Sequence, residues 1–137
     1  MADLHALIRL HKYEVDEKRR EMSQLYEELA ALNQQRLSKI TEQITEQENA
    51  SQSADVHFTM AGYLQKSKLE IEAIEQAMEA KEEEIEEAKE TLMESFAELK
   101  KYEMTQAERE ALEEHERKVK EMNELDEIAL ETYRRKE

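Results

Sequence analysis

The sequence has 137 residues, of which 40% are charged and 5% aromatic, and it contains one glycine and no proline, cysteine or tryptophan. Aromatic and turn-forming residues are too scarce for an ordinary globular core, and such a composition is typical of coiled coils and long helices. The formal net charge of −15 disfavours nucleic acid and anionic membranes as partners, because binding either one needs clustered lysine and arginine. The lack of cysteine excludes disulfide chemistry, and no stretch approaches about 18 apolar residues, so we expect a cytoplasmic protein without direct membrane insertion.

The first predicted element is a helix over residues 3–48. Alternate steps of four and three residues from Leu4 select mostly apolar positions, which is the spacing that keeps one face of a helix against a partner helix. After this series the apolar positions shift by one residue, to Leu37, Ile40 and Ile44, so we expect the packing face to change phase there. The first stripe consists of Leu4, Ile8, His11, Val15, Lys18, Met22, Leu25, Leu29, Leu32 and Arg36.

A turn is predicted at residues 49–54 and a second helix at 55–103. The stretch QENASQSAD is polar and has no position that fits either stripe, and Ser53 or Asp55 is a candidate N-cap for the helix that follows. The second helix has its own stripe with the same spacing. That stripe consists of Met60, Leu64, Ser67, Ile71, Ile74, Met78, Lys81, Ile85, Ala88, Leu92, Ser95, Leu99 and Tyr102.

A helical extension is predicted over residues 105–135. Thr105 and Glu108 match a capping box, which often begins a helix, so residues 105–137 either fold back as a third helix or continue the second one. A returning helix would cover three apolar side chains that lie off the first stripe; otherwise they are exposed for a partner. These side chains are Leu7, Leu10 and Tyr13.

These elements predict an all-α fold, a long antiparallel two-helix coiled coil (a hairpin) in a single domain over residues 1–137. For the C-terminal segment the alternatives are a kinked or separate helix and a straight continuation of the second helix. In this fold the basic cluster 18–20 faces the acidic block 82–87, and we expect that juxtaposition to set the register of the hairpin.

No catalytic, cofactor-binding or metal-binding residue is predicted. The 35 acidic residues match the exterior of a charged coiled coil. The sequence lacks the Glu-x-x-His pairs of di-iron bundles, a glycine-rich phosphate loop and a Ser-His-Asp arrangement on a suitable scaffold. We therefore expect that the protein is not an enzyme.

The opening LHALIRLHKYEVDEKRREM, the segment FTMAGYLQKSKLEIE and the closing LDEIALETY, on an all-helical chain of this length, resemble the flagellar type III export protein FliJ family. The resemblance implies an antiparallel coiled coil, similar to the central stalk of rotary ATPases, that acts in flagellum biogenesis and motility. Members insert their paired ends into the hexameric flagellar export ATPase, promote its assembly and contact the export gate in the inner membrane, and some bind export chaperones. It therefore implies a cytoplasmic protein held at the inner membrane through protein contacts.

The resemblance also implies two groups of site residues. The ATPase-facing group is Leu7, Leu10, Tyr13, Ile128, Leu130 and Tyr133, and the group near the export gate is Leu37, Ile44, Phe58 and Tyr63. Two other functions fit the sequence. One is a cytoplasmic chaperone that holds unfolded chains with exposed Met and Leu side chains, and the other is a purely structural coiled-coil dimer in which residues 47–55 form a joint.

Overall fold

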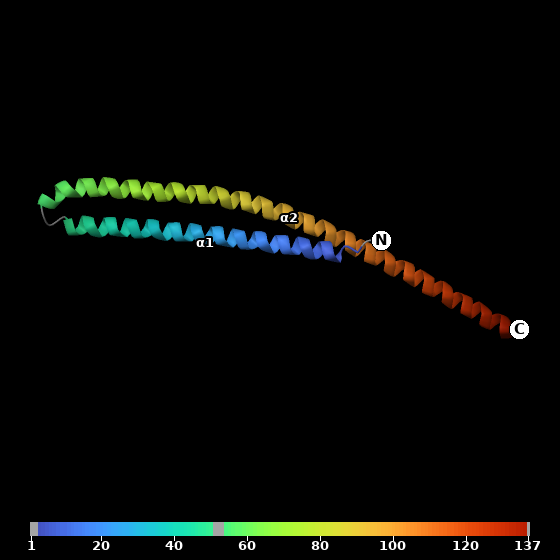
Figure 1. Cartoon of the computed structure of the whole chain (residues 1–137). Helices are drawn as coiled ribbons and strands as arrows, with labels where there is room; N and C mark the ends of the chain where they lie inside the picture. Colours follow the sequence, from blue (N-terminus) through green and yellow to red (C-terminus); the bar gives the residue numbers. More distant parts are fainter. Residues whose placement is uncertain (1–2, 51–53, 137) are drawn as a thin grey trace. The chain divides into compact units, whose positions relative to one another are not determined.

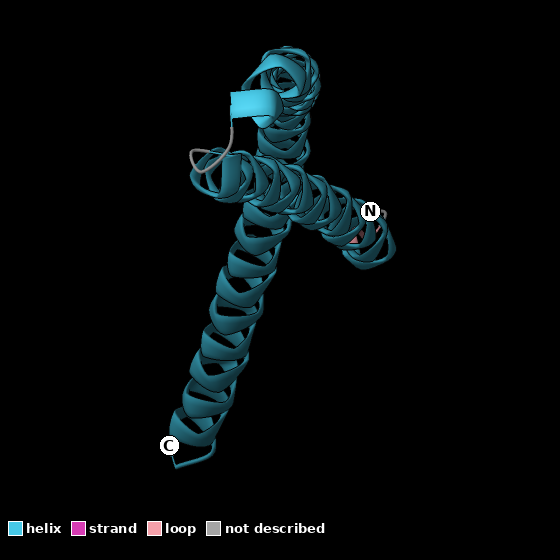
Figure 2. Cartoon of the chain, turned by 90° about the vertical axis from the view of Figure 1, so that its left-hand side faces the viewer, coloured by secondary structure: helices cyan, strands magenta, loops and turns pink. Residues whose placement is uncertain are grey.

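The computed structural model describes residues 3–50 and 54–136, with side chains in these ranges except for residues 54–58 (Figure 1). Two α-helices make up almost all of this part of the chain, α1 (His5–Ala50) and α2 (Ala54–Lys136) (Figure 2). They pack against each other in opposite directions, which confirms the predicted all-α hairpin. The predicted caps, Ser53 and the side chain of Asp55, lie outside the described part.

The composition explains why both helices are so long. No proline interrupts them, and alanine, leucine, glutamate and lysine have high helix propensity. Threonine hydroxyls inside the helices donate a hydrogen bond to the backbone carbonyl four residues earlier. The hydroxyl thus has a hydrogen-bond partner within the helix, and the helix continues past it. This bond is made by Thr41, Thr45, Thr91, Thr105 and Thr132.

The packing face of each helix is the stripe predicted from the sequence. All positions of both stripes are buried or half-buried. The most deeply buried apolar members are Ile8, Val15, Ile85 and Leu99. Most other members keep some exposure, because a two-helix hairpin covers each helix on one side only. The hydrophobic core is therefore a narrow seam.

Contacts divide the chain into two compact units. The middle unit is Asp16–Glu94, and the terminal unit combines Met1–Val15 with Ser95–Glu137. Each unit contains a stretch of α1 packed on a stretch of α2, and each is described separately below.

In the middle unit, two ion pairs between the helices show the register. Lys81 Nζ lies 2.7 Å from Glu28 Oε2, and Lys39 Nζ lies 2.8 Å from Glu70 Oε2. Because the helices are antiparallel, each step toward the start of α1 corresponds to one step toward the end of α2. Nine such steps from the Glu28–Lys81 pair place Arg19 level with Glu90.

This register corrects the expected pairing of the charge blocks. The basic cluster 18–20 lies beyond the acidic block 82–87 instead of facing it. Arg19 and Arg20 pair within α1, with Asp16 and Glu17. The Lys81–Glu28 and Lys39–Glu70 pairs, which do cross between the helices, involve lysines in or beside the seam, and such pairs are harder to predict from sequence blocks.

The expected change of phase after Arg36 is wrong. Leu37 and Ile44 are exposed, whereas Arg36, Lys39 and Gln43 are half-buried and continue the original spacing. Ile40, which neighbours Lys39, is half-buried as well. The seam thus keeps its residue spacing along α1, but polar side chains occupy it there. The large apolar side chains of Leu37 and Ile44 lie outside the seam and are exposed.

In the terminal unit, the beginning of α1 is fastened to α2 by polar and aromatic contacts. The rings of His11 and Tyr102 stack with centroids 4.7 Å apart. The Leu4 backbone N–H donates to Gln106 Oε1 at 3.2 Å, and His5 Nε2 lies 3.1 Å from Glu110 Oε1.

Beyond Glu110, α2 continues without a break to Lys136. The Thr105 hydroxyl donates to the carbonyl of Lys101, so it lies within the helix and does not cap a new one. Between Ala111 and Lys136 every side chain is exposed except that of Glu114, which is half-buried. Of the two alternatives, the structure has the continuous helix, and within residues 3–50 and 54–136 no third helix covers the start of α1.

Candidate functional site

The first candidate surface lies on the α1 segment of the terminal unit. Leu10 and Tyr13 are 53% and 60% exposed, and Leu7 is half-buried. The seam positions Ile8, His11 and Val15 turn toward α2, so Leu10 and Tyr13, which lie between them in the sequence, turn outward. Large apolar side chains held in water on a rigid helix are typical of a surface that binds another protein.

The second half of the predicted ATPase-facing group lies on the free part of α2. Ile128, Leu130 and Tyr133 are all exposed, at 58–66%. They are not beside Leu10, because α1 meets α2 near Tyr102 and a helix rises 1.5 Å per residue, which puts Tyr133 about 45 Å further along α2. The six residues therefore share one unit but form two separate patches.

A second candidate surface lies on α1 in the middle unit. Leu37 and Ile44, predicted to lie near the export gate, are 44% and 50% exposed. Tyr63 of α2 is half-buried at a groove that Lys39 and Glu70 also line. Phe58 belongs to α2, but its side chain is outside the described part.

Sequence reasoning missed three of the five members of this surface, Tyr26, Ala30 and Thr41. Tyr26 is 51% exposed, and its spacing of 11 and 18 residues from Leu37 and Ile44 corresponds to about three and five helical turns. Ala30 and Thr41 lie between them at the same helical spacing and are exposed, so this face of α1 carries no charge between Tyr26 and Ile44. The absence of charge on one face of a chain with 40% charged residues was the signal available in the sequence. We call this surface, Tyr26, Ala30, Leu37, Thr41 and Ile44, the uncharged face.

The two ion pairs described above, Lys39–Glu70 and Lys81–Glu28, shift the pKa values of their partners. Lys39 donates a hydrogen bond to Glu70 and attracts it electrostatically, which lowers the pKa of the Glu70 carboxyl and raises the pKa of the Lys39 ammonium. The Lys81–Glu28 pair has the same effect on its own members. Both pairs join α1 to α2, so their role is to hold the hairpin together.

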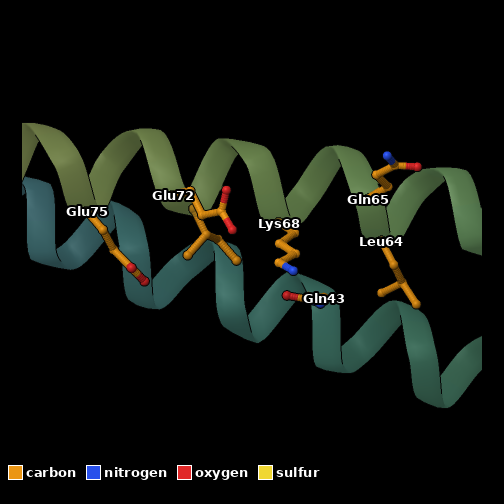
Figure 3. Close-up of a pocket in the computed structure, with 7 residues that line it drawn as sticks. Gln43, Leu64, Gln65, Lys68, Glu72 and Glu75 are labelled. Carbon is orange, nitrogen blue, oxygen red and sulfur yellow. The ribbon is translucent and has the colours of Figure 1, made fainter.

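The grooves of the middle unit are open to solvent and mixed in polarity. In the groove of Figure 3, Leu64 and Lys68 of α2 point toward α1, where Gln43 lies, while Gln65 points away. Glu72 and Glu75 complete the polar side of this groove.

Two searches bear on other kinds of site. Among residues 3–50 and 54–136, no three His, Asp or Glu side chains come together as a metal site would require. Within the same described ranges, neither helix has a segment apolar enough to cross a membrane.

The fold and its exposed surfaces define a class of protein, a charged helical hairpin with apolar patches on its outer faces. The family model described as Flagellar FliJ protein matches residues 1–137, so the chain belongs to the flagellar FliJ family. This family is a non-catalytic component of flagellar export. Searches of curated proteins and of solved structures gave no match.

Proposed function

We propose that this protein is a stalk-like, non-enzymatic component of the flagellar type III export apparatus. It binds the hexameric export ATPase, promotes assembly of the hexamer and couples it to the export gate. Family membership supports the export system as the setting. The observation that carries the finer proposal is the exposure of Leu10 and Tyr13, which no other part of the described chain covers.

The ATPase binds the terminal unit in this proposal. Leu10 and Tyr13 on α1, with Ile128 and Tyr133 on α2, supply the apolar contacts. Interface energy is concentrated in a few large side chains of this kind, with tyrosine among the most frequent. A hairpin presents two different helices to a sixfold ring, so its contacts differ from subunit to subunit and bias their conformational states.

The export gate binds the uncharged face of the middle unit. Leu37 and Ile44 are exposed there, and the face carries no charged side chain from Tyr26 to Ile44, so a partner buries this stretch without desolvating a carboxylate; Glu48 lies one turn beyond it. Contacts with the gate hold the protein at the cytoplasmic face of the inner membrane, and export chaperones are further partners.

The test is the ATPase rate of the cognate export ATPase, titrated with the purified full chain and combined with sizing of the complex. We expect stimulation and conversion of monomers into hexamers. The double variant Leu10→Glu/Tyr13→Glu places charges in the proposed interface and should weaken stimulation by at least about tenfold in apparent affinity. Leu69→Glu is the matched control, because Leu69 is 60% exposed on α2 of the middle unit.

Absence of binding and stimulation by a folded wild-type chain would contradict the proposal. Equal effects of the double variant and of Leu69→Glu would show that the terminal patch is not the binding surface.

A further inference from the structure

Part of α2 in the terminal unit has a second row of regularly spaced side chains, on a side that α1 does not cover. Its apolar members follow one another at helical spacing, which places them on one side of a helix with 3.6 residues per turn. All are exposed, and Met104, Met122 and Leu125 are among the most exposed apolar side chains of the described residues, at 63–66%. We call this row the outer stripe; its apolar members are Phe96, Met104, Ala107, Ala111, Met122 and Leu125.

Carboxylates are numerous on this part of α2, and one of them, Glu114, lies in line with Phe96 at the edge of the outer stripe, where it is half-buried and pairs with Arg117. The remaining positions of the stripe hold Lys100, His115 and Lys118, which are also exposed. Lys100 Nζ lies 5.3 Å from the centre of the Phe96 ring. Acidic residues predominate along both borders: Glu103, Glu110 and Glu121 on one side, where Arg117 pairs with Glu121, and Glu108 and Asp126 on the other.

These borders determine which partner fits. A second copy of the chain is disfavoured, because pairing two outer stripes in either direction puts acidic border against acidic border. The antiparallel arrangement centred on Ala107 and Ala111 also sets Lys100 opposite Lys118. Anionic lipid is disfavoured for the same reason, since membrane-surface helices need lysine and arginine on their polar sides.

We propose that the outer stripe binds an amphipathic helix of another protein whose apolar face is bordered by lysine or arginine. Phe96, Met104, Met122 and Leu125 supply apolar anchors at helical spacing. Ala107 and Ala111 at the centre are small and let the two helix axes approach closely. The Met side chains adapt to the shape of the partner. The bordering carboxylates pair with its cations, so salt weakens the complex.

This site goes beyond the proposed function, which uses other side chains, and its test needs no ATPase. The probe is a labelled synthetic helix of about 30 residues, long enough to span the stripe at 1.5 Å per residue. It carries leucine and alanine on one face and lysine along both borders. A second peptide has glutamate in place of the lysines. Fluorescence anisotropy follows each peptide as the full chain is added.

Two variants of equal charge make the test specific to the stripe. Ala111→Glu puts a carboxylate at its centre, whereas Asn123→Glu adds one at an exposed position off the stripe. The lysine peptide should bind the wild type, and Ala111→Glu should weaken it by about tenfold or more, because a partner would have to desolvate the new charge. Asn123→Glu should change the affinity by less than about twofold. Met104→Gln with Met122→Gln, which leaves the charge unchanged, should also weaken binding.

Other results would overturn the proposal. Equal binding by the two glutamate variants would show general attraction between opposite charges. Binding of the glutamate peptide would show that the acidic borders of the stripe do not select a partner with lysine or arginine. Self-association or binding to anionic vesicles that Ala111→Glu abolishes would identify a different occupant. If the ATPase test failed while the stripe bound the lysine peptide, the proposed function alone would be lost.

Discussion

Replacing Ile85 with alanine tests whether the seam between α1 and α2 supplies the stability of the middle unit. Ile85 is 7% exposed. The change removes three carbon atoms, each contributing about 0.8 kcal/mol when buried, and leaves a cavity that adds to the loss. We therefore expect the free energy of unfolding to fall by about 2 to 3 kcal/mol. With an m-value of about 2 kcal/mol/M, the urea midpoint, followed by helical circular dichroism, should fall by about 1 M or somewhat more.

Met93→Ala is the control for this prediction. Met93 lies on the same helix and in the same unit but is 64% exposed, so its truncation should change the free energy of unfolding by less than about 0.5 kcal/mol. If both variants lowered the urea midpoint equally, the packing of Ile85 against α1 would not be the source of stability, and the hairpin described here would be wrong.

Three further changes test the electrostatics and the backbone. Lys39 lowers the pKa of the Glu70 carboxyl, so the pair stabilises the hairpin above the unfolded pKa of that carboxyl and loses its effect as pH falls through the folded pKa. The difference in melting temperature between the wild type and Glu70→Gln should therefore be present at pH 7 and vanish in acid. A difference that persisted in acid would refute the contribution of the ion pair. Arg19→Glu with Arg20→Glu should cost only about 0.5 to 1 kcal/mol in urea unfolding, because both arginines pair within their own helix; a larger loss would restore the expected facing of charge blocks. Gly62→Ala should raise the melting temperature, with a gain of about 0.5 to 1 kcal/mol, because Gly62 is helical and an added Cβ meets nothing within 4 Å; a decrease would mean that α2 is not a regular helix there.

The sequence was a reliable guide to which side chains meet in the seam. Every stripe position from Leu4 to Arg36 and from Met60 to Tyr102 is buried or half-buried, because a repeat of 3.5 residues can be satisfied only by one partner helix. The register was less predictable. It depends on Lys81 and Lys39 finding single glutamates on the other helix, and pairs of this kind leave no pattern in a sequence rich in both charges.

The candidate surfaces were predicted in part. Leu10 and Tyr13 were expected off the seam, but whether a third helix covers them could not be decided, because Thr105 fits a cap and a helix interior equally well. Leu37 and Ile44 were assigned to the seam on hydrophobicity alone. In the structure, the polar residues Arg36, Lys39 and Gln43 continue the seam. The regular spacing of the helix therefore decides which side chains face the partner helix, even where those side chains are polar.

The central claim is that two separate surfaces of this hairpin bind two different components of the export apparatus. The most direct test is photo-crosslinking in cells that carry out flagellar export, with a photoreactive amino acid placed at Tyr13 or at Tyr26, both of which are exposed. We predict that the product formed from position 13 contains the export ATPase and that the product from position 26 contains the export-gate protein. The same partner at both positions, or neither partner at its own position, would contradict this division of the molecule.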